Sequence, residues 1–260
     1  MNILIFGNGW LGAMLAKAYG ADIFPGRLEQ VTADDLRPYD VVINTAAKTS
    51  IDWCEENKAE ALACNAIYAA TLADLCDRQD IRYVYISSAC IFESADEMDV
   101  KYETSAPNPK CFYAVTKWVG EELVKEAHSE ALIVRIRLPL SEVPHPRNTI
   151  NKIVTYKELV NTEESVTILE DFVPALKEMI DEHATGTYHM VNAGTITMPE
   201  IVSFFHNDFS VIDRYTLRER TQDAGKANRV STIVGSKRIP LLPNVQDRIF
   251  GLVKMYKSHI

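Results

Sequence analysis

The sequence predicts an α/β fold in which helices cover both faces of a parallel sheet. Two observations lead to this prediction. Short apolar runs, typical of buried parallel strands, alternate with longer segments of helical periodicity. A glycine-rich turn joins the first of these strands directly to the first helix. Because strands that alternate with helices imply βαβ units, the sheet they build is expected to be parallel and doubly wound.

The expected elements follow one another along the first half of the chain. The strands, apolar or rich in β-branched and aromatic residues, are NILIFG (2–7), ADIF (21–24), YDVVINTAA (39–47), RYVYISS (82–88) and ALIVRIRLPL (131–140). The helices, with apolar residues at helical spacing, are WLGAMLAKAYG (10–20), EENKAEALACNAIYAATLADLCDRQ (55–79) and KCFYAVTKWVGEELVKEAH (110–128). Gly20 ends the first helix, and Pro139 ends the last strand.

The pattern changes after Pro139. A loop-like stretch with two prolines, SEVPHPRN (141–148), precedes short mixed segments, a late strand GTYHMV (186–191) and a terminal helix PNVQDRIFGLVKMYK (243–257). We therefore expect a larger domain over residues 1–139 and a smaller lobe over residues 140–260. The lobe is expected to pack against the first domain, partly interleaved with it, and to leave a cleft between the two.

Composition and charge exclude several classes of protein. Lys and Arg number 27 and Asp and Glu 36, which gives a net charge of −9 and argues against a nucleic-acid or anionic-membrane binder. Five cysteines without a CxxC pair fit neither a disulfide framework nor a zinc site, and the histidines show no metal-ligand spacing. The sequence shows no signal peptide and no apolar run of about 18 residues. The expected location is the reducing cytoplasm, with no metal and no membrane partner.

The glycine-rich turn GNGWLG predicts a site for a dinucleotide. Gly7 permits the tight turn, Gly9 lets the backbone approach a pyrophosphate, and Gly12 permits close contact between helix and strand. The start of the helix adds free N–H groups and a positive dipole end. The expected cofactor-binding residues here are Gly7, Asn8, Gly9, Trp10, Leu11 and Gly12, which makes residues 1–139 an NADP-binding Rossmann-type domain. A glycine turn without a ligand is the alternative.

The end of the second strand favours NADPH over NADH. An acidic residue at this place would hold the ribose 2′-hydroxyl of NAD, whereas the chain has Gly26-Arg27. The Arg27 guanidinium can hold a 2′-phosphate through charge-assisted hydrogen bonds. A solvated surface arginine explains the same residue, so NADH stays open.

Three side chains predict carbonyl reduction. Tyr113 and Lys117 lie four residues apart in YAVTK, hence on one helix face. A nearby lysine cation is expected to lower the pKa of the Tyr113 phenol toward neutrality, so that it donates a proton to a carbonyl oxygen as hydride reaches the carbon. Ser88, at the end of the preceding strand, would supply a second hydrogen bond to that oxygen.

These motifs resemble a known superfamily. Ser88, YAVTK, GNGWLG and the NTAA strand end, with Ala46 and Ala47 at the cofactor, are similar to the extended short-chain dehydrogenase/reductases. Longer stretches resemble a narrower family, the UDP-4-keto-6-deoxyglucose 3,5-epimerase/4-reductases that form the C-terminal part of UDP-rhamnose synthases. These stretches are IDWCEENKAE, CIFE, RIRLP, PRNTINKI and SVTILED. The glycine loop departs from the family by being one residue shorter.

The resemblance gives Cys90 a chemical role. In this family a cysteine two residues after the catalytic serine or threonine is an epimerisation acid/base, and Lys152 matches its partner acid/base. Protons at C3 and C5 are acidic because the C4 ketone spreads charge as an enolate, and inversion needs groups on opposite faces. Packing is the alternative for Cys90, since cysteine is a frequent small core residue. The resemblance also implies that substrate-binding residues include Ser88, Cys90, Ile91, Asn148, Lys152 and Arg229. The sequence around Arg229 departs from the family pattern.

The sequence therefore predicts a bifunctional enzyme. It would epimerise UDP-4-keto-6-deoxy-D-glucose at C3 and C5 and reduce C4 with NADPH, giving UDP-L-rhamnose. A plain 4-ketoreductase of the dTDP-4-dehydrorhamnose reductase type is one alternative, and a non-catalytic regulatory subunit with this fold is another. The substrate would come from a separate 4,6-dehydratase, and the superfamily resemblance allows a homodimer. Whether UDP or dTDP carries the sugar stays open.

Overall fold

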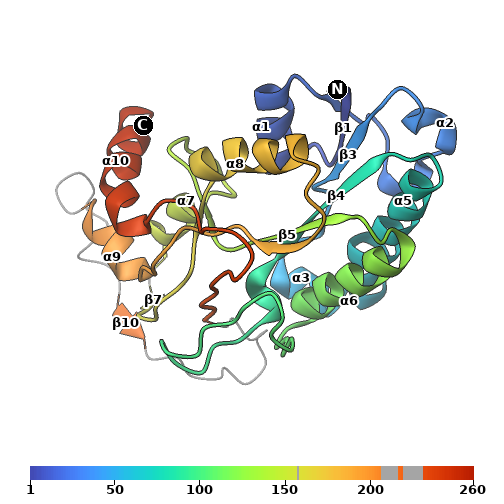
Figure 1. Ribbon diagram of the computed structural model, residues 1–260. Helices are drawn as coiled ribbons and strands as arrows, with labels where there is room; N and C mark the ends of the chain where they lie inside the picture. Colours follow the sequence, from blue (N-terminus) through green and yellow to red (C-terminus); the bar gives the residue numbers. More distant parts are fainter. Residues whose placement is uncertain (157, 206–215, 219–230) are drawn as a thin grey trace.

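A six-stranded parallel sheet forms the centre of the molecule. The structure, a computed structural model, describes residues 1–156, 158–205, 216–218 and 231–260 (Figure 1). The strand order is β2-β1-β3-β4-β5-β9, with every pair parallel. The strands are β1 (Ile3–Phe6), β2 (Asp22–Ile23), β3 (Val41–Asn44), β4 (Arg82–Ser88), β5 (Leu132–Ile136) and β9 (Gly186–His189). The predicted α/β fold with a doubly wound parallel sheet is confirmed.

Helices cover both faces of this sheet, as Figure 1 shows. On one face, α1 (Trp10–Tyr19) and α8 (Leu169–Asp181) pack on alternate strand residues such as Ile3 and Ile5. On the other face, α5 (Tyr68–Asp77) and α6 (Phe112–Ala127) pack on the intervening residues, such as Leu4 and Phe6. Because successive side chains of a strand point to opposite faces, a strand covered on both faces is mainly apolar. The four residues of β1 and the four of β3 are all buried.

The strand order places a ligand site between β1 and β3. From β1 the chain moves outward to β2 and then returns to β3 on the opposite side of β1. At such a switch point, the loops after neighbouring strands turn in opposite directions and leave a crevice outside the carboxyl ends of the strands. The loops that meet here are the glycine-rich turn after β1 and residues 45–50 after β3. The first half of the chain also has three short helices, α2 (Ala33–Leu36), α3 (Ile51–Glu56) and α4 (Lys58–Leu62). Two 3₁₀ turns, Leu28–Gln30 and Ala89–Ile91, lie in the same part of the chain.

The C-terminal part builds a second, smaller core. Its helices are α7 (Thr149–Ile153), α9 (Met198–Ser203) and α10 (Val245–Ser258). Its strands form two parallel pairs: β6 (Pro139–Leu140) with β8 (Thr167–Ile168), and β7 (Glu158–Val160) with β10 (Thr216–Arg218). The same part of the chain also returns to the large sheet, since β9 pairs with β5 and α8 covers the sheet beside α1. The division at residue 139 therefore does not separate two independent sheets.

Three elements differ from the sequence-based expectation. The helix expected over 55–79 is interrupted at Asn57, whose φ of −123° and ψ of 52° are not helical, and contains a π-helical turn at Ala63–Ile67. The strand expected over 131–140 is two strands, because Leu138 has a φ of +35° and turns the chain from the large sheet into the small pair. Helix α8, which was not expected, buries an apolar stripe that includes Phe172 and Leu176.

A buried ion pair ties α6 to the sheet. The Arg135 side chain on β5 donates to both carboxylate oxygens of Glu121 on α6, with Nη2 at 2.6 Å from Oε2 and Nε at 3.0 Å from Oε1. The side chain of Glu121 is 0% exposed and that of Arg135 3%. Ser87 on β4 donates a further hydrogen bond to Glu121, at 2.5 Å. One helix and two strands thus meet at a single carboxylate.

Replacing Arg135 with methionine is expected to destabilise the protein strongly. The variant leaves Glu121 as a buried charge without its bidentate partner, which costs about 3–5 kcal/mol of unfolding free energy. Urea unfolding followed by circular dichroism measures this loss. The control is Lys125→Met, which breaks the exposed pair with Glu122 and should change stability by less than about 1 kcal/mol. A loss of similar size in both variants would contradict the structural role of the Glu121–Arg135 pair.

Candidate active site

The glycine-rich turn is shaped by close backbone contacts. Gly7 has a φ of +101°, and a Cβ atom there would lie 2.7 Å from the backbone nitrogen of Ala46. A Cβ atom at Gly12 would lie 1.8 Å from the carbonyl oxygen of Gly7, so α1 starts pressed against the turn. By contrast, a Cβ atom at Gly9 would meet nothing within 4 Å. Gly7 and Gly12 are required by the fold itself, while Gly9 leaves an open approach to the backbone.

This open approach suits an anionic group. Gly9 is the N-cap of α1, and the first turn of that helix carries no acidic residue. The unpaired N–H groups of a helix start favour phosphate oxygens. Asn8 and Gly9 are exposed beside this helix start, and Trp10 and Leu11 are half-buried. The structure therefore brings the six predicted residues of the turn together at one helix end.

The loop after β3 is fastened to the same place. Thr45 donates from its hydroxyl to the carbonyl oxygens of Phe6 and Gly7, at 2.9 and 3.1 Å. Asn65, which is fully buried, accepts from the backbone N–H of Lys48 at 2.7 Å and donates to its carbonyl at 3.0 Å. The predicted residues Ala46 and Ala47 lie in this loop and are half-buried. The two loops thus form one rigid edge along the crevice.

Arg27 follows β2, as the sequence analysis expects for a residue that selects the cofactor. Its side chain is 81% exposed, and its Nη1 lies 3.8 Å from Glu29 Oε1. An exposed ion pair of this length is weak. The guanidinium is therefore accessible to an anionic group brought to the sheet edge.

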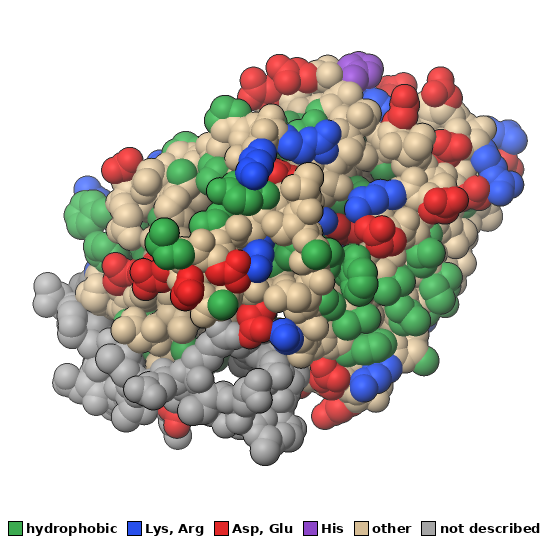
Figure 2. Space-filling view, turned by 60° about the horizontal axis from the view of Figure 1, so that its bottom comes forward, with side chains coloured by type: hydrophobic (Ala, Val, Ile, Leu, Met, Phe, Trp, Pro, Cys, Tyr) green, Lys and Arg blue, Asp and Glu red, His purple; other side chains and the backbone are tan. Residues whose placement is uncertain are grey.

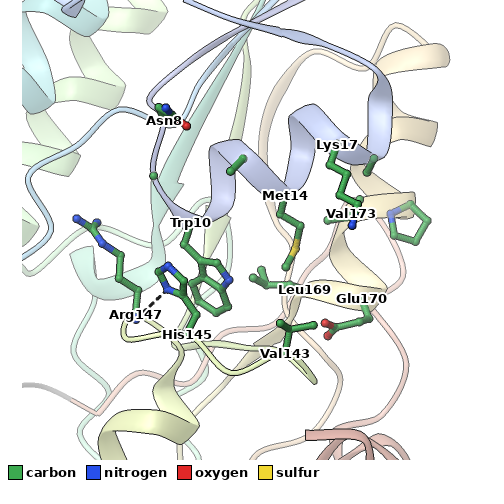
Figure 3. A pocket seen from close by; sticks show the side chains of 14 residues that line it. Asn8, Trp10, Met14, Lys17, Val143, His145, Arg147, Leu169, Glu170 and Val173 are labelled. Atoms are coloured by element: carbon green, nitrogen blue, oxygen red, sulfur yellow. Dashed lines mark hydrogen bonds between the residues drawn. The ribbon is translucent and has the colours of Figure 1, made fainter. Parts of the chain in front are cut away.

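A cavity of about 960 Å³ opens beside the glycine-rich turn (Figure 3). One wall is α1 with Trp10 and Met14, and the opposite wall includes Val143 and Glu170 from the C-terminal part. The indole of Trp10 stacks on the imidazole of His145, with ring centroids 5.2 Å apart and planes within 6°. This stack joins the two parts of the chain next to the pyrophosphate end of the site.

A second contact bridges the crevice near this stack. Arg147 donates from its backbone N–H to His145 Nδ1 at 3.1 Å, and its Nη1 donates to Thr49 Oγ1 at 3.3 Å. Thr49 belongs to the loop after β3, so Arg147 links that loop to the C-terminal part. Its guanidinium is a basic group close to the expected position of the cofactor phosphates, and the sequence analysis did not single it out.

Ser88, Cys90 and Tyr113 form the chemical end of the site. Ser88 is the last residue of β4, and its hydroxyl oxygen accepts from the backbone N–H of Cys90 at 3.3 Å. Cys90 is 5% exposed and packs in one cluster with Cys111, Ala114 and Tyr113. The Ser88 side chain is also close enough to Tyr113 to act on the pKa of its phenol. The structure therefore brings these three predicted residues together at the carboxyl end of β4.

Burial controls the protonation of Cys90 and Tyr113. Burial raises the pKa of the Cys90 thiol to about 12, against smaller opposing effects of the Ser88 hydrogen bond and the Arg137 charge. The thiol therefore holds its proton at neutral pH. Burial also raises the pKa of Tyr113, and the Ser88 side chain acts in the opposite direction. The expectation that the pKa of Tyr113 is lowered toward neutrality is wrong for the protein without cofactor.

The reason lies in the position of Lys117. Lys117 is 1% exposed, and its ammonium group donates to Tyr85 Oη at 2.7 Å and to the carbonyl oxygen of Ile86 at 2.9 Å. Lys117 is on the same helix as Tyr113, one turn further, as expected. Burial lowers the pKa of Lys117 from 10.5 to about 8, while the carboxylate of Glu121 acts in the opposite direction. The charge of Lys117 is thus partnered inside the domain.

The predicted substrate-binding residues fall into different surroundings. Lys152 is exposed on α7. Asn148 is fully buried, caps α7 and donates from its amide to the carbonyl oxygens of Ser141 and Val143. The side chain of Ile91 is fully buried in a core cluster with Phe92. Arg229 lies outside the described residues.

Arg137 was missed by the sequence analysis although it lies in the quoted motif RIRLP. Its Nη2 donates to Glu164 Oε2 at 2.7 Å, and both side chains are about one-tenth exposed. Its positive charge reaches Cys90 and Cys111. Arg137 directly follows β5, and β5 pairs with β4, the strand that ends at Ser88. A basic residue at that strand end could have been recognised in the sequence as a candidate site residue.

Two further features concern possible ligands. Within residues 1–156, 158–205, 216–218 and 231–260, no group of three or more His, Cys, Asp and Glu side chains could hold a metal ion.

None of the helices in these ranges combines the length and the apolar character that crossing a bilayer requires. Acidic and basic side chains are interspersed over the face in Figure 2, so an anionic ligand there depends on individual basic residues.

Curated proteins with similar sequences act on nucleotide-linked deoxysugars. The chain is 31% identical over 228 residues to a bifunctional dTDP-4-dehydrorhamnose 3,5-epimerase/dTDP-4-dehydrorhamnose reductase of Arabidopsis thaliana, covering 79% of this chain and 75% of that protein. It is 32% identical over 281 residues to a trifunctional UDP-glucose 4,6-dehydratase/UDP-4-keto-6-deoxy-D-glucose 3,5-epimerase/UDP-4-keto-L-rhamnose-reductase of the same plant. That match covers 97% of this chain but only 42% of the longer relative.

Solved structures share the fold over almost the whole chain. The L780 UDP-rhamnose synthase of Acanthamoeba polyphaga mimivirus superposes with a TM-score of 0.86 at 24% identity, covering 98% of this chain and 99% of that one. A dTDP-4-dehydrorhamnose reductase from Bacillus anthracis in complex with NADP superposes with a TM-score of 0.79 at 22% identity, covering 98% of each chain.

The family itself follows from a match over most of the chain. Residues 1–229 match the RmlD substrate binding domain. The matched region includes the glycine-rich turn, Ser88, Cys90, Tyr113 and Lys117. The chain therefore belongs to the RmlD substrate-binding domain family of the extended short-chain dehydrogenase/reductases, a family of NAD(P)-dependent nucleotide-sugar reductases.

Proposed function

We propose that this protein is an NADPH-dependent 3,5-epimerase/4-reductase that converts UDP-4-keto-6-deoxy-D-glucose to UDP-L-rhamnose. The observation that supports it best is the position of Cys90. Its thiol packs in the same cluster as Tyr113, and its backbone N–H donates to the Ser88 hydroxyl. A reductase needs only the serine and the tyrosine at the carbonyl, so a thiol at this place favours a second, proton-transferring reaction on the same sugar.

The reduction uses Ser88 and Tyr113 at the C4 carbonyl. When bound, NADPH supplies hydride to C4. The Ser88 hydroxyl orients the carbonyl oxygen, and the Tyr113 phenol, which holds its proton firmly in the buried site, donates that proton to the developing alkoxide. Lys117, one turn further along α6, is the residue that we propose to hold the nicotinamide ribose.

The epimerisation uses the same carbonyl as an electron sink. A base removes the proton at C3 or C5, and the charge moves to the C4 oxygen, where Ser88 and Tyr113 stabilise the enolate. The Cys90 thiol carries its proton at neutral pH, which suits return of a proton to the opposite face of the carbon. Lys152, exposed on α7, is the residue that we propose as its partner. Arg137 adds positive charge near the developing anion.

The cofactor and substrate assignments rest on separate features. NADPH is favoured over NADH by the exposed Arg27 at the end of β2 and by the absence of an acidic residue in its place. A UDP-linked substrate is favoured by the stretches shared with the UDP-rhamnose enzymes. A separate 4,6-dehydratase would supply the 4-keto sugar, and cytoplasmic location and a homodimer remain part of this proposal.

Exchange with solvent separates the bifunctional enzyme from a plain 4-ketoreductase. UDP-4-keto-6-deoxyglucose is incubated with the protein in D2O without nicotinamide cofactor and followed by proton NMR. Deuterium entering at C3 and C5 is the expected result, because enolisation needs no hydride. No exchange, followed by reduction of the pre-epimerised ketone when NADPH is added, would leave the protein a plain 4-ketoreductase.

Replacing Cys90 with alanine is expected to slow this exchange about 10²- to 10⁴-fold, the usual contribution of a positioned acid or base. NADPH binding, measured by fluorescence titration, should stay unchanged. The control is Cys76→Ala, which removes a fully buried thiol on α5 that packs against Tyr83 rather than in the active-site cluster. If Cys90→Ala and Cys76→Ala exchange equally fast, Cys90 is a packing residue.

Replacing Gly9 with alanine is expected to weaken NADPH binding without weakening the fold. The added methyl group meets no protein atom within 4 Å, so the unfolding free energy should change by less than about 0.5 kcal/mol. It would occupy the space where the pyrophosphate approaches the backbone, at a cost of about 1.4 kcal/mol or more, which is a tenfold higher Kd. Calorimetric titration measures the Kd.

Gly251→Ala serves as the control for the Gly9 variant. Gly251 lies within α10, and a methyl group there also meets nothing within 4 Å. Both variants should fold normally, and only the Gly9 variant should bind NADPH poorly. Unchanged affinity in the Gly9 variant would place the cofactor elsewhere.

A further inference from the structure

The partners of Lys117 involve a residue that the proposed mechanism does not use. An ammonium group has three N–H donors, and two of them are occupied by Tyr85 Oη at 2.7 Å and the Ile86 carbonyl at 2.9 Å. The Lys117 nitrogen also lies 4.0 Å from the centre of the Tyr85 ring. Tyr85 therefore contacts the charge through both its hydroxyl and its aromatic face.

The Tyr85 hydroxyl is itself fixed in one orientation. Tyr85 is fully buried on β4 and donates to the carbonyl oxygen of Asn65 at 2.7 Å. Asn65 lies in the π-helical turn Ala63–Ile67 between α4 and α5, where the helical hydrogen-bond pattern is interrupted. With its proton given to Asn65, the hydroxyl can only accept from Lys117. Lys117 therefore donates to Tyr85, and Tyr85 donates to the Asn65 carbonyl.

Helix α6 packs closely against this hydroxyl at Gly120. A Cβ atom at Gly120, one helical turn after Lys117, would lie 2.6 Å from both Tyr85 Oη and the Asn65 carbonyl oxygen. Glycine at this position lets α6 approach the π-helical turn closely enough for Lys117 to reach the tyrosine. The same Asn65 holds the loop after β3 through Lys48 and donates to Thr116 Oγ1 at 2.9 Å.

We propose that Tyr85 is a positioning residue of the reductase site: with the Ile86 carbonyl, its hydroxyl holds two N–H donors of Lys117 and leaves the third for the nicotinamide ribose. This inference rests on the proposed function, because the ribose is the ligand that the third donor would meet. Tyr85 touches neither substrate nor cofactor in this arrangement. It acts on the reaction by keeping the ammonium in one place and in its charged form.

The charge state of Lys117 depends on few neighbours. Burial lowers its pKa to about 8, and the groups that act on it from the packed elements are Glu121 on α6, Cys90 after β4 and Cys64 on the π-helical turn. The Tyr85 hydroxyl adds an oxygen acceptor, which stabilises the ammonium over the neutral amine. Loss of this acceptor favours the neutral amine. As the pH rises, reduction that requires the ammonium should then be lost at a lower pH than in the wild type.

Replacing Tyr85 with phenylalanine tests this role while keeping the ring. The pKa of Lys117 in the cofactor-free protein is measured by NMR of lysine labelled with ¹³C at the ε carbon. The expected result is a midpoint about one pH unit lower than in the wild type, a tenfold weaker proton affinity. The high-pH limb of NADPH-dependent reduction should shift in the same direction, and the KM for NADPH should rise.

Tyr83→Phe is the matched control. Tyr83 lies two residues earlier on the same strand and is also buried, and its hydroxyl donates to the Ala69 carbonyl at 3.0 Å and accepts from Asn44 at 2.8 Å. It has no hydrogen bond with Lys117 among the described residues. Tyr83→Phe should lower the melting temperature about as much as Tyr85→Phe but leave the Lys117 midpoint and the pH profile unchanged.

The outcomes separate this inference from the proposed function. Equal Lys117 midpoints in the wild type and the Tyr85 variant would overturn the role of Tyr85, whatever the activity. A wild type that neither binds NADPH nor reduces the 4-keto sugar would overturn the proposed function, while the NMR midpoint would still decide whether Tyr85 holds Lys117. Tyr85→Met, which also lacks the hydroxyl, provides a second variant if the phenylalanine variant does not fold.

Discussion

The buried carboxylate of Glu121 holds the catalytic helix against the sheet. It accepts hydrogen bonds from Arg135 on β5 and Ser87 on β4, the two strands whose ends border the chemical part of the site. Glu121 lies one turn after Lys117 and two turns after Tyr113, on the same side of α6. Because both side chains are almost fully buried, a small shift of α6 would leave each charge buried without its partner. The position of the phenol relative to Ser88 therefore depends on an interaction two helical turns away.

Local patterns explain why much of the fold could be predicted from the sequence. The buried strands are mainly apolar, and one glycine after β1 has a local cause, since a Cβ atom at Gly12 would meet the Gly7 carbonyl oxygen. Ser88 and Cys90 are two residues apart at the end of β4, and the family resemblance predicted that they share a site with Tyr113. The C-terminal part was harder to predict. Helix α8 contains a proline, Pro174, and the chain turns at Leu138, a residue type that does not usually mark a turn.

The partners of the site residues were harder to predict than the residues themselves. YAVTK suggests that Lys117 acts on Tyr113, but the ammonium bonds to Tyr85 on another element. That contact depends on the π-helical turn and on the missing side chain at Gly120, neither of which has a periodic signature in the sequence.

The return of the chain to the large sheet has a consequence for how this protein assembles. Strand β9 comes from the part of the chain that also builds the smaller core, yet it lies beside β5 as the last strand of the sheet. Until residue 189 is synthesised, β5 presents an unpaired edge of apolar residues, and α8 does not yet cover the face beside α1. Such an edge can pair with other chains. The first 139 residues therefore do not complete the six-stranded sheet, which gains its last strand only after a further 50 residues, up to His189, have been made.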